Sequence, residues 1–300
     1  MQVKSRKVLL CGGAGGTQGG AIATRLLQSG YAVTTIARSR EKCAQLKARG
    51  IEARPGDLGD LESLRLAGDG AEYIAFVLPL ERDRNKLALY TDNVIAVARA
   101  INARNLVFNT SSRIPELENR VPGFAEKSMV DAQLRDSGIP FICLRPTIYM
   151  ENIAAPWSVQ DINERACVKY PIAADKPIRW NSVDDIAAWV VAALDKTQLA
   201  GRVFEIGGPE AVTGRDIAVQ FSQALGRDIH YEGITPAQFA AGLVPFLGET
   251  QAMGLVSYYE FINAHPQNWA EVSEDLSVLG YQARDTFKTW AGRLHPGVFG

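Results

Sequence analysis

The stretch that decides the fold is Val8-Leu9-Leu10-Cys11-Gly12-Gly13-Ala14-Gly15-Gly16-Thr17-Gln18-Gly19-Gly20-Ala21. Its apolar start predicts a strand over 7–11, and the residues after the glycines predict a helix over 21–28. Gly13, Gly16 and Gly19 have GxxGxxG spacing, in which the glycines permit a tight turn, close approach to a pyrophosphate and close helix–strand packing. The helix N-terminus favours an anion there. The stretch therefore predicts a dinucleotide site made by Gly13, Gly15, Gly16, Thr17, Gln18 and Gly19.

The alternative is a glycine-rich turn that binds nothing, because a glycine pattern alone is a weak signal. The strand before it, the helix after it and its place in the first structural unit favour the dinucleotide site. A phosphate-binding P-loop is disfavoured because no Gly-Lys-Ser/Thr sequence follows.

Strand-like and helix-like segments alternate through the first half of the chain. Strands are predicted over 7–11, 32–37, 51–54, 73–78, 105–110 and 141–145, and helices over 21–28, 40–49, 61–66, 87–103 and 124–136. This alternation predicts an α/β fold with a doubly wound parallel sheet of the Rossmann type and right-handed crossovers.

The pattern changes after about residue 150. The segment 151–177 reads as irregular. Ser182 is a plausible cap for an apolar helix over 186–194, and a strand is predicted over 202–206. Further helices are predicted over 213–225, 236–246 and 249–263, with a helical tail over 276–300. We therefore predict a Rossmann domain over 1–150 with returning segments at about 182–208, and a smaller C-terminal α+β substrate-binding region over 151–300.

Charge at the end of the second strand bears on the choice of cofactor. A site that prefers NAD usually carries an acid about 20 residues after the glycines. This chain has Arg38 there, which would pair with the 2′-phosphate of NADP(H), aided by Arg40 or Lys42. A solvated cation at a helix start is the alternative. Three further strand ends add candidate cofactor contacts, namely Asp57 and Leu58, Leu78, and Thr110 with the adjacent hydroxyls of Ser111 and Ser112. An ordinary loop acid is the alternative for Asp57, and helix capping is the alternative for the three hydroxyls.

Composition excludes several classes of function. The 300 residues carry a formal net charge of −1, which indicates neither a nucleic-acid nor a membrane partner. The four cysteines form no CxxC pair and read as reduced, buried thiols of a cytoplasmic protein. The three histidines lie far apart without ligand spacing, so no metal site is predicted.

The chain resembles the NmrA-like family of atypical short-chain dehydrogenases. The resemblance rests on the glycine stretch, Arg38 and Lys127, and on the motif that runs from Leu144-Arg-Pro146 to Tyr149-Met-Glu-Asn152, with Val183-Asp-Asp-Ile186 further on. It covers roughly residues 5 to 210. It implies an NADP(H)-binding Rossmann domain with a small substrate domain. The family holds reductases of quinones and of phenolic or heterocyclic metabolites, and also members that bind the cofactor and act as redox-linked regulators.

The candidate catalytic residues are Lys127 and Tyr149. Typical short-chain dehydrogenases use Tyr-x-x-x-Lys, but the position of the tyrosine is Gly123 here, which puts that mechanism in doubt. The resemblance places Lys127 near the nicotinamide ribose, where it would orient the cofactor or act as an acid or base. Tyr149 is a spare phenol for proton donation, and Asn152 a candidate cofactor contact. The alternatives are a surface lysine on a helix for Lys127, simple packing for Tyr149 and the fixing of a loop for Asn152.

Two main functions follow from these observations, and a third possibility keeps the cofactor pocket for a non-redox isomerisation or cyclisation. The first is an NADPH-dependent oxidoreductase that passes hydride to a small apolar or aromatic carbonyl, quinone or unsaturated heterocycle. The second is an NADP(H)-binding redox sensor with little turnover, and the missing tyrosine favours it. A planar, apolar substrate would suit the aromatic residues of the second half: Trp157, Tyr170, Trp180, Tyr258, Tyr259 and Phe261. The sequence leaves open a homo-oligomer or a protein partner.

Overall fold

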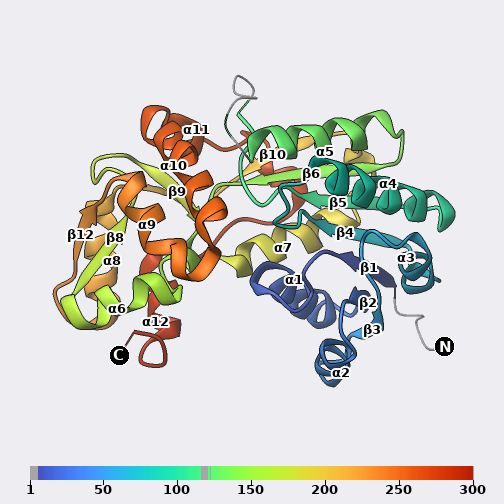
Figure 1. Ribbon diagram of the computed structural model, residues 1–300, viewed down its shortest axis with the longest axis horizontal. Coiled ribbons are helices and arrows are strands. Elements are labelled where there is room, and N and C mark those ends of the chain that lie inside the picture. Colours follow the sequence, from blue (N-terminus) through green and yellow to red (C-terminus); the bar gives the residue numbers. More distant parts are fainter. Residues whose placement is uncertain (1–5, 116–120, 122, 300) are drawn as a thin grey trace.

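One parallel sheet holds the first half of the chain together (Figure 1). The computed structural model describes residues 6–115, 121 and 123–299. In this part of the chain the sheet has seven strands in the spatial order β10–β6–β5–β4–β1–β2–β3, and all its neighbouring pairs are parallel. The strands are β1 (Lys7–Cys11), β2 (Ala32–Ala37), β3 (Glu52–Pro55), β4 (Tyr73–Val77), β5 (Asn105–Asn109), β6 (Phe141–Pro146) and β10 (Val203–Ile206). The predicted doubly wound fold is confirmed.

Helices cover both faces of this sheet, because both faces of its strands are apolar. Val8 and Leu10 of β1 belong to one core and Leu9 and Cys11 to the other, as expected for side chains that alternate along a strand. The first core is covered by α1 (Thr17–Gln28), α2 (Arg40–Ala48) and α7 (Val183–Leu194). The second is covered by α3 (Leu61–Gly68), α4 (Arg84–Ala100) and α5 (Phe124–Asp136).

The helix starts differ in a way that matters for the site. Asp60, Asp83 and Ser182 each accept backbone N–H groups at the N-terminus of α3, α4 and α7 respectively. The start of α1 has Gly16 as its cap residue, no side-chain cap and no acid in its first turn. Because the first N–H groups of a helix have no partner within it, α1 begins with donors available to a ligand.

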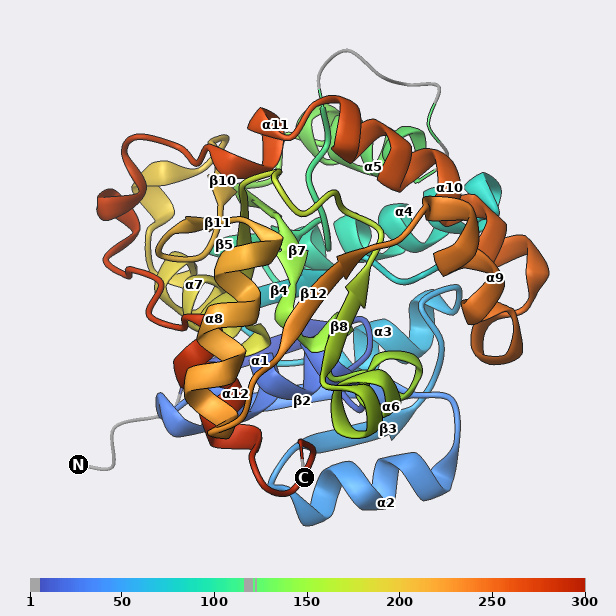
Figure 2. The same ribbon diagram turned by 90° about the vertical axis from the view of Figure 1, so that its left-hand side faces the viewer.

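A second region packs beside the sheet (Figure 2). It carries its own core, which is rich in aromatic residues. Its strands are β7 (Ile148–Tyr149), β8 (Cys167–Tyr170), β9 (Ile178–Asn181), β11 (Ala211–Val212) and β12 (His230–Gly233). Its helices are α6 (Pro156–Arg165), α8 (Gly214–Leu225), α9 (Pro236–Leu247), α10 (Glu249–Ala264), α11 (Gln267–Ala270) and α12 (Phe287–Leu294). Short 3₁₀ turns lie at η1 (Met150–Asn152), η2 (Thr197–Leu199) and η3 (Leu276–Leu279). The predicted α+β character is confirmed, whereas the predicted boundary at residue 150 stays a prediction.

Two predictions about this region were wrong. The segment 151–177 is not irregular, because Pro156 starts α6 and Ala166, in the left-handed conformation at φ 52°, ends it before β8. The tail over 276–300 is not one helix. Gly280, at φ 77°, ends η3, and the chain then runs without regular structure until Thr286 caps α12. Tertiary contacts hold that stretch, since Asp285 is buried and pairs with Arg293.

All four cysteines are buried and free, as predicted. Over the described ranges, no helix combines the length and the apolar character that crossing a bilayer requires.

The amino ends of β1, β2 and β4 are tied to the end of α7 by one carboxylate. Asp195 accepts hydrogen bonds from Arg6, at 2.5 Å, from the hydroxyl of Tyr31, at 2.8 Å, and from that of Tyr73, at 2.9 Å. Burial raises the pKa of Asp195, but these three partners outweigh it, so the pKa lies below its usual value. The carboxylate therefore holds the returning helix α7 against the first half of the chain.

Replacing this carboxylate is expected to destabilise the fold in a pH-dependent way. Asp195→Ala should lower the free energy of unfolding by about 2 kcal/mol near neutral pH, since it removes several charge-assisted hydrogen bonds. Because the folded-state pKa is depressed, this contribution is present above the unfolded pKa of about 3.9 and is lost as the pH falls through the folded value. Chemical denaturation of both proteins across this range should show the two curves converging in acid. Asp136→Ala, at an exposed position, is the control, and an equal loss in both variants would contradict the assignment.

Candidate active site

A cavity of about 640 Å³ opens at the carboxyl ends of the strands. Its walls come from the turn between β1 and α1, from the loops after β4 and β5, from the start of α5 and from α10. Ligands of open α/β sheets bind at this edge. The cavity brings together nine of the residues predicted from the sequence: Gly13, Gly16, Thr17, Gln18, Gly19, Leu78, Lys127, Tyr149 and Asn152.

The turn between β1 and α1 is built by glycines that leave no room for side chains. Gly12 and Gly13 have φ angles of +94° and +62°, in the left-handed region that glycine adopts without strain. A methyl group on Gly12 would lie 2.2 Å from the Val77 carbonyl oxygen. One on Gly19 would lie 2.3 Å from the Gly13 carbonyl oxygen. The backbone of the turn is therefore packed against β4 on one side and against the first turn of α1 on the other.

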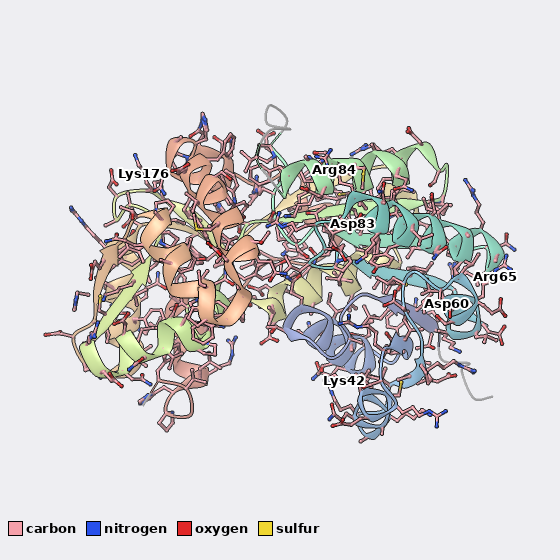
Figure 3. The ribbon with its side chains drawn as sticks, viewed as in Figure 1. Lys42, Asp60, Arg65, Asp83, Arg84 and Lys176 are labelled. Atoms are coloured by element: carbon pink, nitrogen blue, oxygen red, sulfur yellow. The ribbon has the colours of Figure 1, made fainter. Side chains whose placement is uncertain are left out.

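The residues at this turn fit a diphosphate. The first amides of α1 have no side-chain cap, and no acidic residue lies in its first turn. The side chain of Lys42, labelled in Figure 3, lies over the turn, because a methyl group on Gly15 would be 2.8 Å from its ammonium nitrogen. A helix N-terminus and a lysine together provide N–H donors and positive charge for a phosphate group. Gly15 itself does not line the cavity, and its predicted role would be to admit Lys42.

The predicted residues at the neighbouring strand ends lie outside the cavity. Arg38 is exposed directly after β2, and Leu58 is buried. The Asp57 carboxylate accepts the Gly59 N–H at 2.9 Å. Both Arg38 and Asp57 lie close enough to Tyr90 to influence the pKa of its phenol, which burial, the leading cause, raises. This edge would face the adenosine half of a dinucleotide. The guanidinium of Arg38 is exposed there, where it would contact the 2′-phosphate of NADP(H).

A hydrogen-bond cluster forms around the side chain of Gln18. Its Oε1 atom accepts from Tyr149 OH at 3.0 Å, from Asn109 Nδ2 at 3.2 Å and from Ser111 Oγ at 3.2 Å. Burial raises the pKa of Tyr149 far above its usual value. The phenol is therefore neutral at physiological pH, and its proton points to the glutamine rather than to a base.

The residues after β5 place two serines at the cavity, whereas the threonine before them is buried in the interior. Ser111 has a φ of +61°, which is rare for a residue other than glycine, and Asn109 holds it by accepting its N–H at 2.9 Å. The side chains of Ser111 and Ser112 both line the cavity. Thr110 is fully buried, and its hydroxyl donates to the Ser112 carbonyl oxygen at 2.6 Å. The structure therefore does not bring the predicted Thr110 to the cavity, because the strand turns this side chain toward the interior.

Lys127 lies on α5 in the cavity wall, four residues after Gly123. Gly123 has a φ of +95°, and its N–H donates to the Glu126 carboxylate at 2.6 Å. Burial and, to a smaller extent, the positive charge of Arg82 lower the pKa of Lys127 to about 8, while the charge of Glu126 acts in the opposite direction. The ammonium group is therefore poised to change charge near physiological pH.

Helix α10 of the second region forms the far wall of the cavity, which is lined by Leu255, Tyr258 and Tyr259. Burial raises the pKa of Tyr258 to about 12, and its hydroxyl lies beside Ser112. The predicted cofactor contact Asn152 turns toward this side, since it donates to the hydroxyl of Tyr170 at 3.0 Å. Tyr170 in turn lies 2.7 Å from the hydroxyl of Tyr259.

A second cavity continues the first. The two share Thr17, Gln18, Tyr149 and Asn152, and the second extends to Trp157 and Trp290. Among the predicted aromatic residues, Tyr258 and Tyr259 line the first cavity and Trp157 the second. Trp180 and Tyr170 are buried in the core, and Phe261 packs on Phe124.

Sequence reasoning pointed to Ser111 and Ser112 beside Thr110, but it missed Gly12, Arg82 and Leu255 as site members. Ligands bind at the carboxyl ends of parallel strands, and this rule could have found Arg82, which lies in the loop after β4. The aromatic residues of the second half indicated Tyr258 and Tyr259 of α10, whereas Leu255 had no signal in the sequence, because its place depends on how the second region packs.

The strand order and the glycine turn define a protein of the Rossmann-type dinucleotide-binding class. The chain belongs to the NmrA-like family, whose model matches residues 4–287. This confirms the resemblance seen in the motifs.

Three similar proteins are reductases or oxidoreductases by name, and two of the names include NAD(P)H or NADPH. An "NAD(P)H azoreductase" from Xenophilus azovorans is 26% identical over 295 residues, which cover 98% of this chain and 99% of that one. A "(4-alkanoyl-5-oxo-2,5-dihydrofuran-3-yl)methyl phosphate reductase" from Streptomyces griseus is 30% identical, over 78% of this chain and 80% of that one. The crystal structure of an NADPH-dependent quinone oxidoreductase from Escherichia coli, complexed with NADPH, superposes with a TM-score of 0.78 at 25% identity, covering 96% of this chain and 99% of that one.

The close packing of the turn predicts opposite effects for two adjacent glycines. Gly19→Ala should weaken NADPH binding by about tenfold or more, since the added methyl group displaces the Gly13 carbonyl and with it the turn. Gly20→Ala should leave binding intact and stabilise α1 by up to about 1 kcal/mol, since its methyl group has room and alanine favours a helix. Fluorescence titration with NADPH and thermal unfolding measure both effects. Equal affinities in the two variants would contradict the role given to the turn.

Proposed function

We propose that the protein is an NADPH-dependent oxidoreductase that reduces a small, planar, largely apolar acceptor of the quinone, carbonyl or unsaturated heterocycle class. One observation carries the proposal, namely that a single cavity runs from the glycine turn past Lys127 to the aromatic wall of α10. A cofactor and a substrate would share it. The similar proteins named as reductases of azo compounds and quinones support the same general activity.

Residues at the carboxyl edge of the sheet would hold the cofactor. The uncapped start of α1 and Lys42 would bind the diphosphate, and Arg38 the 2′-phosphate. Leu78, at the end of β4, would lie along the cofactor, and Lys127 would bind near the nicotinamide ribose. When bound, NADPH supplies the hydride, and the protein supplies position and electrostatics.

The protein itself would stabilise the charge that develops on the substrate and would supply a proton. The ammonium of Lys127 would stabilise the negative charge that develops on the substrate oxygen or nitrogen. Tyr149 is neutral and lines the same cavity, where it would donate a proton once its hydroxyl leaves Gln18. Leu255 and the rings of Tyr258 and Tyr259 would exclude water and stack on a planar ring.

Lys127 provides the direct test of this function. With NADPH and a panel of quinones and carbonyl compounds, the wild type should oxidise the nicotinamide, followed at its absorbance band. The rate should fall as the pH rises through about 8, because the lysine then loses its proton. Lys127→Gln should lose about 100-fold in kcat together with this pH dependence. The exposed Lys47→Gln is the control and should keep both.

The same experiment also distinguishes the enzyme from the alternative function, a redox sensor. Tight binding of NADPH without oxidation across a broad panel would refute the enzyme and favour a regulator, consistent with Gly123 at the position of the usual tyrosine. A cytoplasmic location, and a homo-oligomer or protein partner, stay predictions.

Cofactor preference provides a separate test at the other end of the cavity. Arg38→Ala should raise the Kd for NADPH about tenfold while leaving that for NADH unchanged, since only NADPH carries the 2′-phosphate. Titration of the wild type and of Arg65→Ala, whose side chain lies on α3 far from Lys42 in Figure 3, supplies the control. If wild-type protein bound the two nucleotides equally, the preference for NADPH would be wrong.

A further inference from the structure

Arg82 lies in the loop between β4 and α4 and lines the same cavity as Lys127. It is half-buried. A methyl group on Gly123 would be 3.0 Å from its Nη1 atom and 3.9 Å from Lys127 Nζ, so both cations reach the same point of the cavity wall. The loop thus directs a guanidinium to the place where the usual tyrosine is missing.

Two glycines make room for this guanidinium. Gly123, at the start of α5, is one of them, and its positive φ already favours glycine. Gly254, in the middle of α10, is the other, and a methyl group there would be 3.3 Å from Arg82 Nη2. Its φ is not in the left-handed region, and a glycine inside a helix is destabilising, so the space it leaves for Arg82 is a physical reason for its presence.

The two cations have no direct ion-pair partner among the described residues, although the nearby charge of Glu126 partly offsets that of Lys127. In the part of the chain that the structure describes, the Arg82 side chain makes no hydrogen bond and no ion pair. The adjacent carboxylates are engaged elsewhere: Glu81 accepts the N–H groups of Arg82 and Asp83, and Glu126 accepts that of Gly123. Like charges in a partly buried site repel unless an anion joins them, so the arrangement favours a negatively charged ligand.

This ligand is not accounted for by the cofactor phosphates. Those would lie at the glycine turn under Lys42, whereas Arg82 directly precedes α4, whose start is marked by Asp83 and Arg84 in Figure 3. In that view Lys42 lies low on the region that holds the seven-stranded sheet, and Asp83 and Arg84 lie well above it on the same region. Arg82 also contacts the region of α10, which builds the substrate wall.

We infer that Arg82 is a specificity-determining residue that selects substrates carrying an anionic group, such as a sulfonate, carboxylate or phosphate, next to the ring or double bond that is reduced. The guanidinium presents paired N–H donors whose geometry matches the oxygens of such groups. This inference rests on the proposed function, because it assigns the substrate class of the same cavity.

The test compares one naphthoquinone with the same quinone carrying a single sulfonate. Arg82→Gln should lower kcat/KM for the sulfonated quinone about tenfold, mainly through KM, and leave that for the neutral quinone unchanged. Arg82→Lys should restore part of the loss, since it keeps the charge but not the paired donors. Lys86→Gln removes a charge four residues away, at a position that lines neither this cavity nor the second one, and should behave as wild type. Each variant is compared with wild type on the same quinone, so differences in reduction potential cancel.

Calorimetry of an inert naphthalenesulfonate with the NADP⁺-loaded protein gives a readout that needs no turnover. Wild type should bind it, and Arg82→Gln should bind it about tenfold more weakly. If neither quinone is reduced, the proposed function fails, and calorimetry still decides the role of Arg82. Equal binding in wild type and variant, no binding in wild type, or an equal loss for both quinones would overturn the inference. So would a loss of NADPH affinity in Arg82→Gln, which would assign the arginine to the cofactor.

Discussion

The close contact of backbone with backbone at the first strand–helix turn is the constraint on which the rest of the structure depends. Gly12 approaches the carbonyl of Val77 on β4, and Gly19 approaches that of Gly13, at distances that exclude even a methyl group. This contact directs the uncapped start of α1 at the carboxyl edge of the sheet. It also brings Gln18 to Tyr149 and Ser111, so the turn organises the ends of β5 and β6 as well.

Charge is distributed along the resulting cleft in a consistent way. Cations lie at each place where a ligand would bring negative charge: Lys42 at the turn, Lys127 on α5, and Arg82 opposite α10. The acids close to them are engaged with backbone N–H groups, as Glu81 and Glu126 show. The site therefore combines an anion-binding edge with an apolar wall, which suits a charged cofactor beside a planar substrate.

Much of the fold could be predicted because it depends on local pattern. The strands over 7–11 and 32–37 and the helix over 124–136 agree with β1, β2 and α5, since alternating burial and caps are written into neighbouring residues. The tail over 276–300 failed because Asp285 and its partners replace a helix with long-range contacts that no local signal shows. Of the candidate site, the glycine turn and Lys127 were accessible from motifs. The burial of Thr110 was not, because the direction of a side chain at a strand end is decided by its neighbours.

The sequence by itself determined the doubly wound sheet, the glycine turn and the position of the lysine, because spacing along the chain controls strand ends, helix caps and close backbone approach. Only the tertiary structure decided what faces that turn. The packing of α10 against the sheet edge places Gly254 and Leu255 at the cavity, more than a hundred residues after Lys127. Contacts at such separation arise from the shapes of two folded regions, and so no local pattern records them.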